Sequence, residues 1–403
     1  MKIQVLCPHF EPDSAPTGEF MSAIVKNLGE LGHELHVVTA LPWYREHAVD
    51  AGWEGRLIRT ETRPWGKITR VHPFPTDKTN IAARGAAFAG FAAIGLVAAV
   101  IERFPADVVF AMSPPLHLGL AGWAAAKRRQ VPFVFNIQDV FPDVAIETGT
   151  ITNPKVIKVA KRLEKLVYDS ADVVTVLSDE MRRNVESKSD STVEVIPNFV
   201  DVSTFQPQPI ENSYREEFGL AGKRIVMYCG NVGFSQSIEL LADAAREMRD
   251  LDDVVFVVNG GGSAIREVHR RAEGLDNFRI IPYQPVERVP EVLAAADIHV
   301  IPLRKGLAWS SVPSKLYKIL AVERPVIASV DEGTEVGRVV VEAGAGHAVP
   351  PEDPEPLIAS LRQLLASPEE RRAMGASGRH WVEAWTTPAR AAKQYESVFN
   401  ELM

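Results

Sequence analysis

The sequence predicts an α/β protein made of two doubly wound domains, and three observations support this prediction. Its 403 residues suggest two domains, because a domain usually has about 100 to 200 residues. Hydrophobic residues make up 46% and charged residues 24% of the chain, as in ordinary folded proteins. Short apolar runs alternate with segments of helical periodicity along almost the whole chain. This alternation is typical of parallel sheets covered by helices.

The first domain is expected over residues 1–203. It opens with a strand over 2–7 and a loop containing Gly18, which leads into a helix ended by Gly32. A strand over 34–39 completes a βαβ unit. Further strands are expected at 107–112, 133–137, 172–177 and 193–196, and helices at 116–128 and 155–170.

A proline-containing linker leads to the second domain, which is expected over residues 204–387. Its strands are expected at 224–229, 254–259, 279–281, 298–301 and 326–329, and its helices at about 235–249, 263–272, 312–322 and 354–366. The two halves share this layout, so we expect two Rossmann-like domains facing each other across a cleft. Parallel sheets bind ligands at the carboxyl ends of their strands, which makes the cleft the expected site.

Composition and charge disfavour several classes of protein. Lys and Arg total 44 and Asp and Glu total 52, a net charge of -8, which disfavours nucleic-acid binding by phosphate neutralisation. The two cysteines, Cys7 and Cys229, supply neither a disulfide framework nor a metal site and suit a reducing cytosol. The first residues show no signal-peptide pattern. We therefore expect a cytoplasmic protein.

Residues 86–101 form a run of sixteen without charged side chains. The run is shorter than the about 20 apolar residues of a bilayer span. A buried helix is the favoured interpretation, and a face that contacts a membrane surface is the alternative.

Familiar catalytic patterns are missing from the sequence. It has no P-loop, HExxH or GxSxG, and its first loop lacks GxGxxG, which disfavours nucleotidases, proteases, hydrolases and nicotinamide enzymes. Asp250-Leu251-Asp252 has the spacing of a metal-binding DxD. It lies at an expected turn, however, where solvated carboxylates are the favoured interpretation.

Glycines in the second half suggest an anion-binding site. Gly230, Asn231 and Gly233 follow a predicted strand and precede a predicted helix. Backbone N–H groups at a helix N-terminus bind phosphate, and glycine permits close approach. Residues 260–262 repeat this arrangement one unit later. A turn that needs glycine for its conformation alone is the alternative.

Ser314 and Lys315 strengthen this prediction. Pro313 suits the first turn of a helix, so both residues would lie at a helix N-terminus, where a hydroxyl and an ammonium can meet a diphosphate. A solvated surface lysine is the alternative. The glycines and Lys315 would lie at strand carboxyl ends of one domain and would bind one ligand.

An ordered set of motifs resembles the retaining glycosyltransferases of family 4 and spans essentially the full chain. The set comprises Gly18, Gly32-His33, 195–201, 228–233, 295–297, 313–317 and 324–328. Within the family, the chain is most similar to the branch of colanic acid and O-antigen N-acetylfucosaminyltransferases. The resemblance implies the GT-B fold, with an acceptor-binding first domain, a nucleotide-sugar-binding second domain and a last segment, 388–403, whose helix crosses back to the first.

The resemblance also implies roles for individual residues. Gly230, Asn231 and Gly233 would touch the donor diphosphate, which Ser314 and Lys315 would neutralise as it leaves. The segment around Tyr283 would face the nucleobase through backbone groups, and Gly18 would join the donor site. No metal is implied, and no cofactor beyond the nucleotide-sugar substrate.

The chain departs from the family at its Glu-x7-Glu element. Alignment on Pro325 puts Ser310 and Lys318 where the two glutamates usually stand, and a lysine cannot accept hydrogen bonds from ribose hydroxyls. Either another acidic residue, such as Glu335, takes this role or the ribose is bound differently.

In the first domain, Asp139 follows a predicted buried strand and lies at its carboxyl end. Relatives have a catalytic-site His or Asp at this point. The resemblance therefore suggests that Asp139 polarises the acceptor hydroxyl or supports positive charge on the sugar. Capping of a turn before Pro142 is the alternative.

We expect retaining transfer of a hexosyl or N-acetylhexosaminyl group from a UDP-sugar to a polyprenyl-diphosphate-linked saccharide, in cell-surface polysaccharide assembly. A transferase for a soluble natural product, a UDP-sugar 2-epimerase and a catalytically inactive sugar-nucleotide-binding subunit are the alternatives. A basic helix face could hold the first domain against anionic lipid at the inner face of the plasma membrane, and a solvated face is the alternative. Its residues are Lys155, Lys158, Lys161, Arg162 and Lys165.

Overall fold

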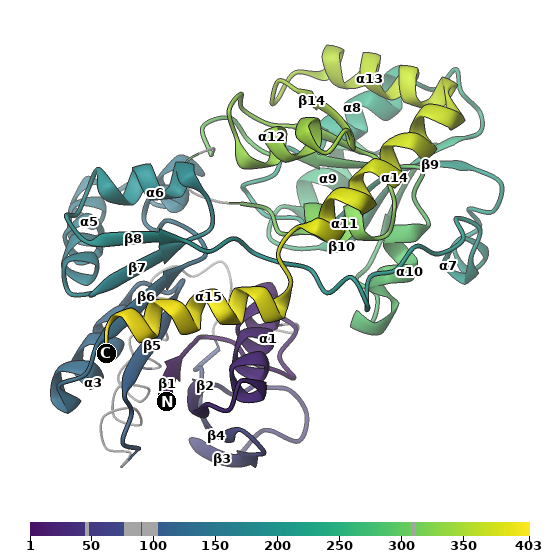
Figure 1. Ribbon diagram of the computed structural model, residues 1–403. Coiled ribbons are helices and arrows are strands. Elements are labelled where there is room, and N and C mark those ends of the chain that lie inside the picture. Colours follow the sequence, from purple (N-terminus) through teal and green to yellow (C-terminus); the bar gives the residue numbers. More distant parts are fainter. Residues whose placement is uncertain (45–47, 76–89, 91–103, 308, 310–311) are drawn as a thin grey trace. The chain divides into compact units, whose positions relative to one another are not determined.

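The computed structural model describes the chain except residues 45–47, 76–89, 91–103, 308 and 310–311. The chain forms two compact units, shown in Figure 1. Unit 1 comprises Met1–Asn198 together with Pro388–Met403, and unit 2 comprises Phe199–Thr387. The apolar run 86–101, apart from Gly90, and Ser310 lie outside the described residues.

Unit 1 contains an eight-stranded sheet in the order β3-β4-β2-β1-β5-β6-β7-β8. All neighbouring strands are parallel except β3 and β4. Every residue of β5 is buried, as expected for a central parallel strand covered on both faces. The strands are β1 Lys2–Leu6, β2 Glu34–Ala40, β3 Ile58–Arg63, β4 Gly66–Val71, β5 Val108–Ser113, β6 Phe133–Ile137, β7 Val173–Val176 and β8 Thr192–Val195.

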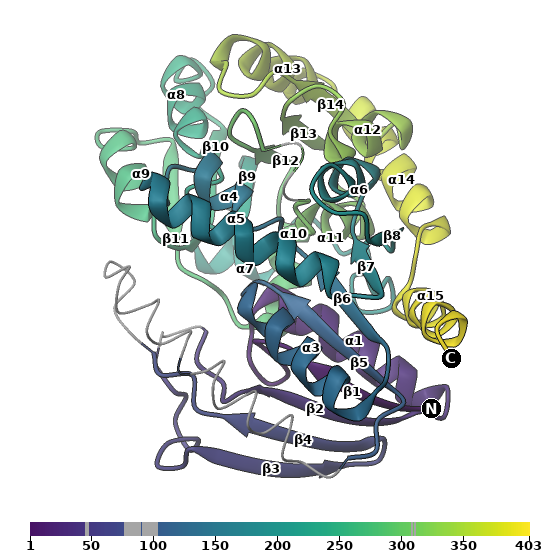
Figure 2. The same ribbon diagram turned by 90° about the vertical axis from the view of Figure 1, so that its left-hand side faces the viewer.

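The helices of unit 1 begin at residues that suit a helix start. Asn153 caps α5, because its side chain accepts a hydrogen bond from the Lys155 backbone N–H, and Pro154 occupies the first turn. Ser178 caps α6 in the same way. The helices are α1 Pro16–Glu30, α3 His117–Arg129, α4 Asp143–Glu147, α5 Pro154–Asp169, α6 Asp179–Glu186 and α15 Pro388–Glu401. In Figure 2, α5 runs across the front of the view.

The last helix, α15, packs beside α1 in unit 1 (Figure 1). Its Tyr395 and Phe399 are buried, and their rings lie 4.9 and 5.5 Å from the ring of Phe110 in β5. Asn136 Nδ2 donates to Tyr395 Oη at 2.9 Å. The helix therefore completes the core of a sheet whose strands lie far earlier in the chain.

Unit 2 contains a six-stranded parallel sheet in the order β11-β10-β9-β12-β13-β14. The strands are β9 Arg224–Asn231, β10 Val254–Gly261, β11 Phe278–Ile281, β12 Ile298–Pro302, β13 Val326–Ser329 and β14 Gly346–Val349. The helices are α7 Ser213–Glu217, α8 Glu239–Glu247, α9 Ile265–Arg271, the 3₁₀ turn Val286–Arg288, α10 Val289–Ala294, α11 Lys315–Ala321, α12 Glu335–Glu342, α13 Pro354–Ala366 and α14 Pro368–Ala384.

The predicted fold class is confirmed, with local corrections. Three strands, β3, β4 and β14, were not predicted because they have no long apolar run. Gly18 lies inside α1 and not in the preceding loop. Gly32 follows the helix with φ +89°, a conformation that favours glycine, and the prediction of its capping position is confirmed.

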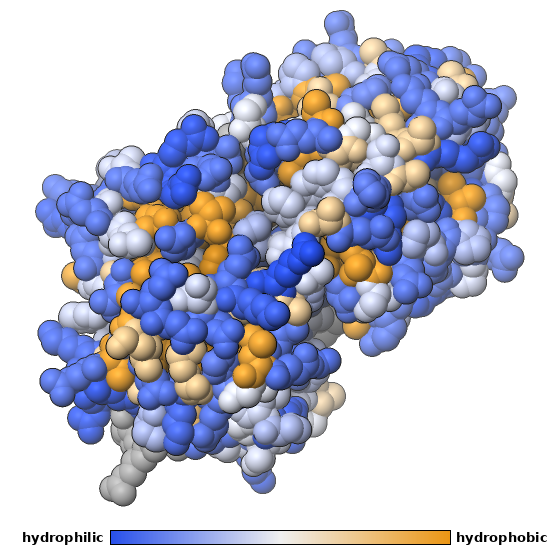
Figure 3. Space-filling model, in the orientation of Figure 1, coloured by the Kyte–Doolittle hydropathy of each residue, from blue (hydrophilic) through white to orange (hydrophobic). Residues whose placement is uncertain are grey.

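The surface seen in Figure 3 is mainly hydrophilic, and its hydrophobic residues form small separate groups. Within the part of the chain that the structure describes, no helix combines the length and the apolar character that a membrane span requires.

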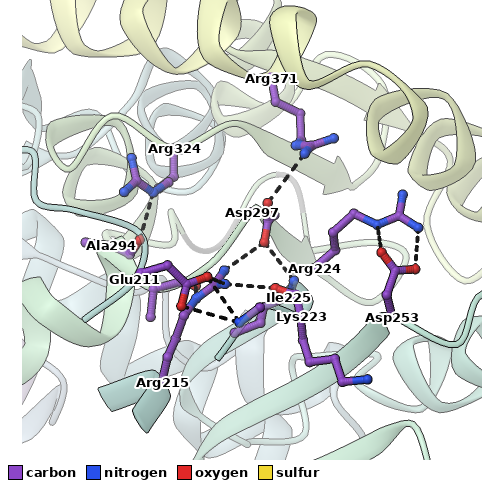
Figure 4. Close-up of polar contacts among 12 residues, drawn as sticks. Glu211, Arg215, Lys223, Arg224, Ile225, Asp253, Ala294, Asp297, Arg324 and Arg371 are labelled. Atoms are coloured by element: carbon purple, nitrogen blue, oxygen red, sulfur yellow. Dashed lines mark hydrogen bonds and ion pairs between the residues drawn. The ribbon is translucent and has the colours of Figure 1, made fainter. Parts of the chain in front are cut away.

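A buried ion pair joins three segments of unit 2 (Figure 4). Arg215 in α7 and Asp297, just before β12, form this pair at 2.8 Å, and the same carboxylate oxygen accepts from the Ile225 N–H of β9 at 2.8 Å. Arg215 also donates to the carbonyl of Ala295 at 2.8 Å. The pair therefore fixes the chain that enters unit 2 to the start of its sheet.

Candidate functional site

Two neighbouring strands of unit 2 end in glycines that face each other. Gly230 at the end of β9 pairs with Gly260 of β10, and their φ angles are +132° and +153°. A Cβ atom on Gly260 would lie only 2.0 Å from the Gly230 carbonyl oxygen. Glycine is therefore required here by both conformation and space, and it leaves backbone groups without side-chain cover at the strand ends.

No helix begins directly after these glycines, so the prediction of a helix N-terminus at this place was wrong. Strand β9 continues through Asn231, and α8 begins only at Glu239. The N–H of Gly233 donates to Gln236 Oε1 at 2.9 Å. Because glycines tolerate both strand and turn conformations, their presence alone could not show that the strand continued.

The side chain of Lys315 reaches the first of these glycine ends. Its Nζ donates to Tyr228 Oη at 2.6 Å and lies 3.8 Å from the centroid of the Tyr228 ring. A Cβ atom on Gly230 would lie 3.1 Å from the same nitrogen. The Tyr228 hydroxyl in turn donates to the carbonyl of Asn231. The structure thus brings together the glycine end and the lysine that the sequence analysis assigned to one ligand.

The ammonium of Lys315 lacks a negative partner among the described residues. Its removal from water lowers the pKa from 10.5 to about 7. The neighbouring Cys229 does not supply a thiolate at neutral pH, because burial raises the pKa of its thiol to about 11. A partly buried cation without a counter-ion favours the binding of an anion.

Ser314 and Lys315 lie at the start of α11, and their predicted position is confirmed. Helix α11 begins at Lys315, and Ser314 is its N-cap residue. The Ser314 side chain makes no capping hydrogen bond. Pro313 lies just outside the helix and not in its first turn.

Tyr283 lies against the second glycine end through its side chain, where the sequence analysis expected backbone groups. Its hydroxyl donates to the Gly261 carbonyl at 2.7 Å and lies 3.4 Å from Asn231 Oδ1. The side chain remains substantially exposed. An exposed aromatic ring of this kind can stack on a flat ligand such as a base.

Glu335 is the buried first residue of α12 and forms an ion pair with Arg338. Burial, followed by the charge of Glu335, raises the pKa of Tyr317, a residue of α11. The carboxylate therefore lies near α11 but is already held by an arginine. Lys318 lies with its Nζ 5.2 Å from the Phe205 ring centroid.

Unit 1 carries a separate polar cluster at the carboxyl ends of β1 and β6. His9 Nδ1 and Asp13 Oδ2 lie 2.6 Å apart, and Asp13 Oδ1 accepts from the Tyr44 backbone N–H at 3.1 Å. Burial raises the pKa of the Tyr44 hydroxyl, and the charges of Asp13 and Asp139 raise it further. Asp139 thus belongs to a group of residues from three loops.

The residues His9, Asp13 and Tyr44 were not among the predicted site residues. The available signal was the position of His9, a polar residue two places after the first predicted strand. Gly18 lies beside this cluster, since a Cβ atom there would lie 3.0 Å from His9 Cβ. Gly18 therefore belongs to unit 1, and the glycine ends belong to unit 2.

The described residues contain no group of three or more His, Cys, Asp or Glu side chains placed to hold a metal ion. In the DxD segment, the Asp250 carboxylate accepts two hydrogen bonds from Arg362, at 2.9 and 2.8 Å.

Comparison with known families matches both halves of the chain. Residues 17–198 match the "Glycosyl transferase 4-like domain", and residues 223–367 match "Glycosyl transferases group 1". Two parallel-sheet α/β domains with these matches define a glycosyltransferase of the GT-B class. The first match lies in unit 1 and the second in unit 2.

One similar protein is WcaI of Escherichia coli (strain K12), whose name describes a glycosyl transferase of colanic acid biosynthesis. It is 28% identical over 383 residues, which cover 92% of this chain and 93% of WcaI. Among solved structures, sucrose-phosphate synthase from Thermosynechococcus elongatus is similar with a TM-score of 0.78 and 17% identity, over 100% of this chain and 99% of that chain. Anabaena HepE in complex with UDP-glucose is similar with a TM-score of 0.72 and 13% identity, over 100% of both chains. At these identities the two structures show the shared fold.

Proposed function

We propose that the protein is a retaining, metal-independent glycosyltransferase that transfers a hexosyl or N-acetylhexosaminyl group from a UDP-sugar. The acceptor is the hydroxyl of a lipid-linked saccharide in cell-surface polysaccharide assembly, at the cytoplasmic face of the membrane. One observation carries the donor half of the proposal: the Lys315 ammonium, without a carboxylate partner among the described residues, lies at the glycine end of β9. The similarity to WcaI supports the polysaccharide role, and the UDP-glucose complex of HepE supports the donor.

The reaction requires groups that stabilise charge as the bond between the sugar and the diphosphate breaks. Departure of the diphosphate leaves positive charge on the sugar ring and negative charge on the phosphates. Lys315 supplies a positive charge next to the glycine end of β9, and the strand ends at Gly230 and Gly260 supply backbone groups that no side chain covers. Loss of one such group typically costs about 3 to 4 kcal/mol of barrier. Tyr283 supports the base next to these strand ends, and Ser314 offers a hydroxyl beside Lys315.

The acceptor half rests on unit 1. Asp139 and the His9–Asp13 pair can accept a hydrogen bond from the attacking hydroxyl. Asp13 is buried and holds the imidazole through Nδ1, which leaves Nε2 to face a ligand. No other described residue makes a hydrogen bond with that nitrogen. Retention follows from attack on the same face of the sugar.

The test of the donor site is the variant Lys315→Met. Wild-type protein is expected to show a thermal shift with UDP, and the variant is expected to lose it while keeping the wild-type circular dichroism spectrum. Lys26→Met, which changes an exposed lysine of α1, is the matched control and should keep the shift. An unchanged UDP response in Lys315→Met would show that the diphosphate does not bind at this lysine.

A panel of UDP, GDP, dTDP and ADP sugars in the same assay identifies the nucleobase. A thermal shift with a GDP-sugar and none with any UDP-sugar would contradict the donor assignment. Release of UDP from the donor distinguishes a transferase from an inactive binding subunit, and an isomerised UDP-sugar product would identify an epimerase.

A further inference from the structure

The outer face of α5 in unit 1 has a pattern that the donor and acceptor sites do not use. The inner face fixes the orientation of the helix, because Glu164, Val167 and Tyr168 are buried. Glu164 Oε1 accepts from Lys188 Nζ at 2.7 Å and lies 3.2 Å from Tyr168 Oη. The helix also packs against α3. The opposite face is therefore held outward.

Two parallel stripes of side chains follow this outer face. The apolar stripe contains Val156, Val159, Leu163 and Leu166, at intervals of three, four and three residues. Val156, Val159 and Leu166 are 48%, 64% and 49% exposed. The basic stripe contains Lys155, Lys158, Arg162 and Lys165, each one residue before a member of the apolar stripe. On a helix, such spacing places the two stripes side by side.

The charge of this face is positive although the chain as a whole carries -8. The two acidic residues of α5 offset this charge only at Lys165. Glu164 points inward and binds Lys188, and Asp169 lies at the C-terminal end of the helix, where it pairs with Lys165 at 3.2 Å. Lys161 adds a further exposed cation. A shallow depression on this face is lined by residues of α5 alone, among them Ile157, Lys158 and Arg162.

This combination fits one kind of partner. Cations alone would fit any polyanion, but the apolar stripe beside them would remain in water on a nucleic acid. At the surface of an anionic bilayer, the valines and leucines can enter the headgroup region while the lysines and Arg162 contact lipid phosphates. In Figure 2, no other ribbon of unit 1 is drawn over the middle of α5.

We propose that the outer face of α5 docks unit 1 onto an anionic lipid bilayer. The apolar stripe lies at the boundary of headgroups and acyl chains, and the basic stripe lies on the phosphates. The role of this docking surface, which is to bring a lipid-linked acceptor to unit 1, rests on the proposed function. Binding to the bilayer itself requires neither donor nor acceptor.

Flotation with vesicles of defined composition tests the proposal on the full chain. One set is phosphatidylcholine alone, and the other contains about one third phosphatidylglycerol. The charge variant is Lys158→Glu with Arg162→Glu. Its matched control is Lys393→Glu with Arg372→Glu, which makes the same change at exposed residues of α15 and α14. The apolar variant is Val159→Asp, and its control is Val341→Asp, a residue of α12 that is 62% exposed.

Wild-type protein is expected to float with the anionic vesicles and not with phosphatidylcholine alone. The charge variant should lower the partition coefficient by more than about twentyfold, since each cation near an anionic surface contributes about 1 kcal/mol. Val159→Asp should lower it as well, and both controls should bind as wild type does.

Three results would overturn the proposal: no binding of wild type to anionic vesicles, equal binding to both vesicle types, or equal losses in variants and controls. UDP thermal shifts measured on the same proteins keep the two proposals apart. Vesicle binding without a UDP response contradicts the donor assignment alone, and a UDP response without vesicle binding contradicts the docking surface alone.

Discussion

The donor assignment depends on Lys315. The partial burial of its ammonium costs free energy, and the same ammonium can bind an anion. Removal from water lowers its pKa to about 7, so the free protein at neutral pH holds this group only partly protonated. A bound diphosphate favours the charged form and raises the pKa again. Anion binding at this site is therefore coupled to the uptake of a proton.

The coupling predicts a pH dependence with a defined sign. The pKa of Lys315 in the free protein is about 7. Well below this pH the side chain is already protonated, so diphosphate binding takes up no proton. Above this pH, binding takes up one proton. The affinity for UDP-glucose should fall by up to about tenfold per pH unit above pH 7. Titration calorimetry in two buffers with different ionisation enthalpies measures both the affinity and the proton uptake.

The variant Lys315→Met serves as the control for this experiment. Its residual binding should not change between about pH 6 and pH 8.5, since the titrating group is gone. A wild-type affinity that stays constant over this range, with no proton uptake, would contradict the coupling.

At the residue scale the sequence could predict positions but not partners. The location of Lys315 at the start of α11 followed from local signals around Pro313. Its contact with Tyr228 joins residues 87 positions apart, and no local pattern encodes such a contact. The His9–Asp13 pair lies in a loop, where no periodicity shows which side chains meet.

Among the elements of unit 2, the entry segment is held by charge as well as by packing. The Arg215 side chain is 2% exposed and the Asp297 side chain 10% exposed. Arg371 of α14 also lies 3.5 Å from this carboxylate. Removal of one partner of a buried ion pair leaves the other charge without compensation. The resulting loss of folding free energy is larger than the net stabilisation that the intact pair provides.

Figure 4 contains a matched pair of carboxylates that tests this argument. Asp297→Asn should lower the free energy of unfolding by about 3 kcal/mol, the lower end of the cost of breaking a buried pair. It removes the buried carboxylate that Arg215 binds, whereas the half-exposed Glu211, 2.7 Å from the same guanidinium, remains. Asp253→Asn should lower the free energy of unfolding by about 1 kcal/mol or less, since Asp253 is 52% exposed although it binds Arg224 at 2.6 Å. Urea denaturation measures both. Equal losses in the two variants would show that burial does not determine the contribution of the pair.

Buried helices and strands could be predicted from the sequence more accurately than exposed ones. Strand β6 and helix α13 have the bounds that the sequence predicted, since four of the five strand residues are apolar and the helix starts with a proline. Strand β3 alternates exposed and half-buried positions and reads Ile-Arg-Thr-Glu-Thr-Arg. An edge strand of this kind has too little apolar character to distinguish it from a loop.

At the scale of the whole molecule, each unit has its own hydrophobic core. Phe399 of α15 is fully buried in unit 1, and Phe256 of β10 is fully buried in unit 2. The alternation of strands and helices was enough to predict two such units. The partners of α15 could not be derived from that alternation, because its apolar face does not specify which sheet it covers.

Separate cores predict separate responses to cavity-forming substitutions. Phe399→Ala should destabilise unit 1 by about 3 to 5 kcal/mol while UDP binding persists. Phe256→Ala should instead destabilise unit 2 and weaken UDP binding. Hydrogen exchange followed by peptide locates the loss of protection. Loss of protection in unit 2 of Phe399→Ala would contradict the independence of the cores.

The return of α15 to unit 1 has a consequence for biosynthesis. Unit 2, residues 199–387, is complete when it leaves the ribosome, whereas unit 1 still lacks the helix that covers Phe110. The usual order, in which the N-terminal domain folds first, is therefore reversed for the final step. The nascent N-terminal half must keep an unfinished apolar surface until translation reaches residues 388–403.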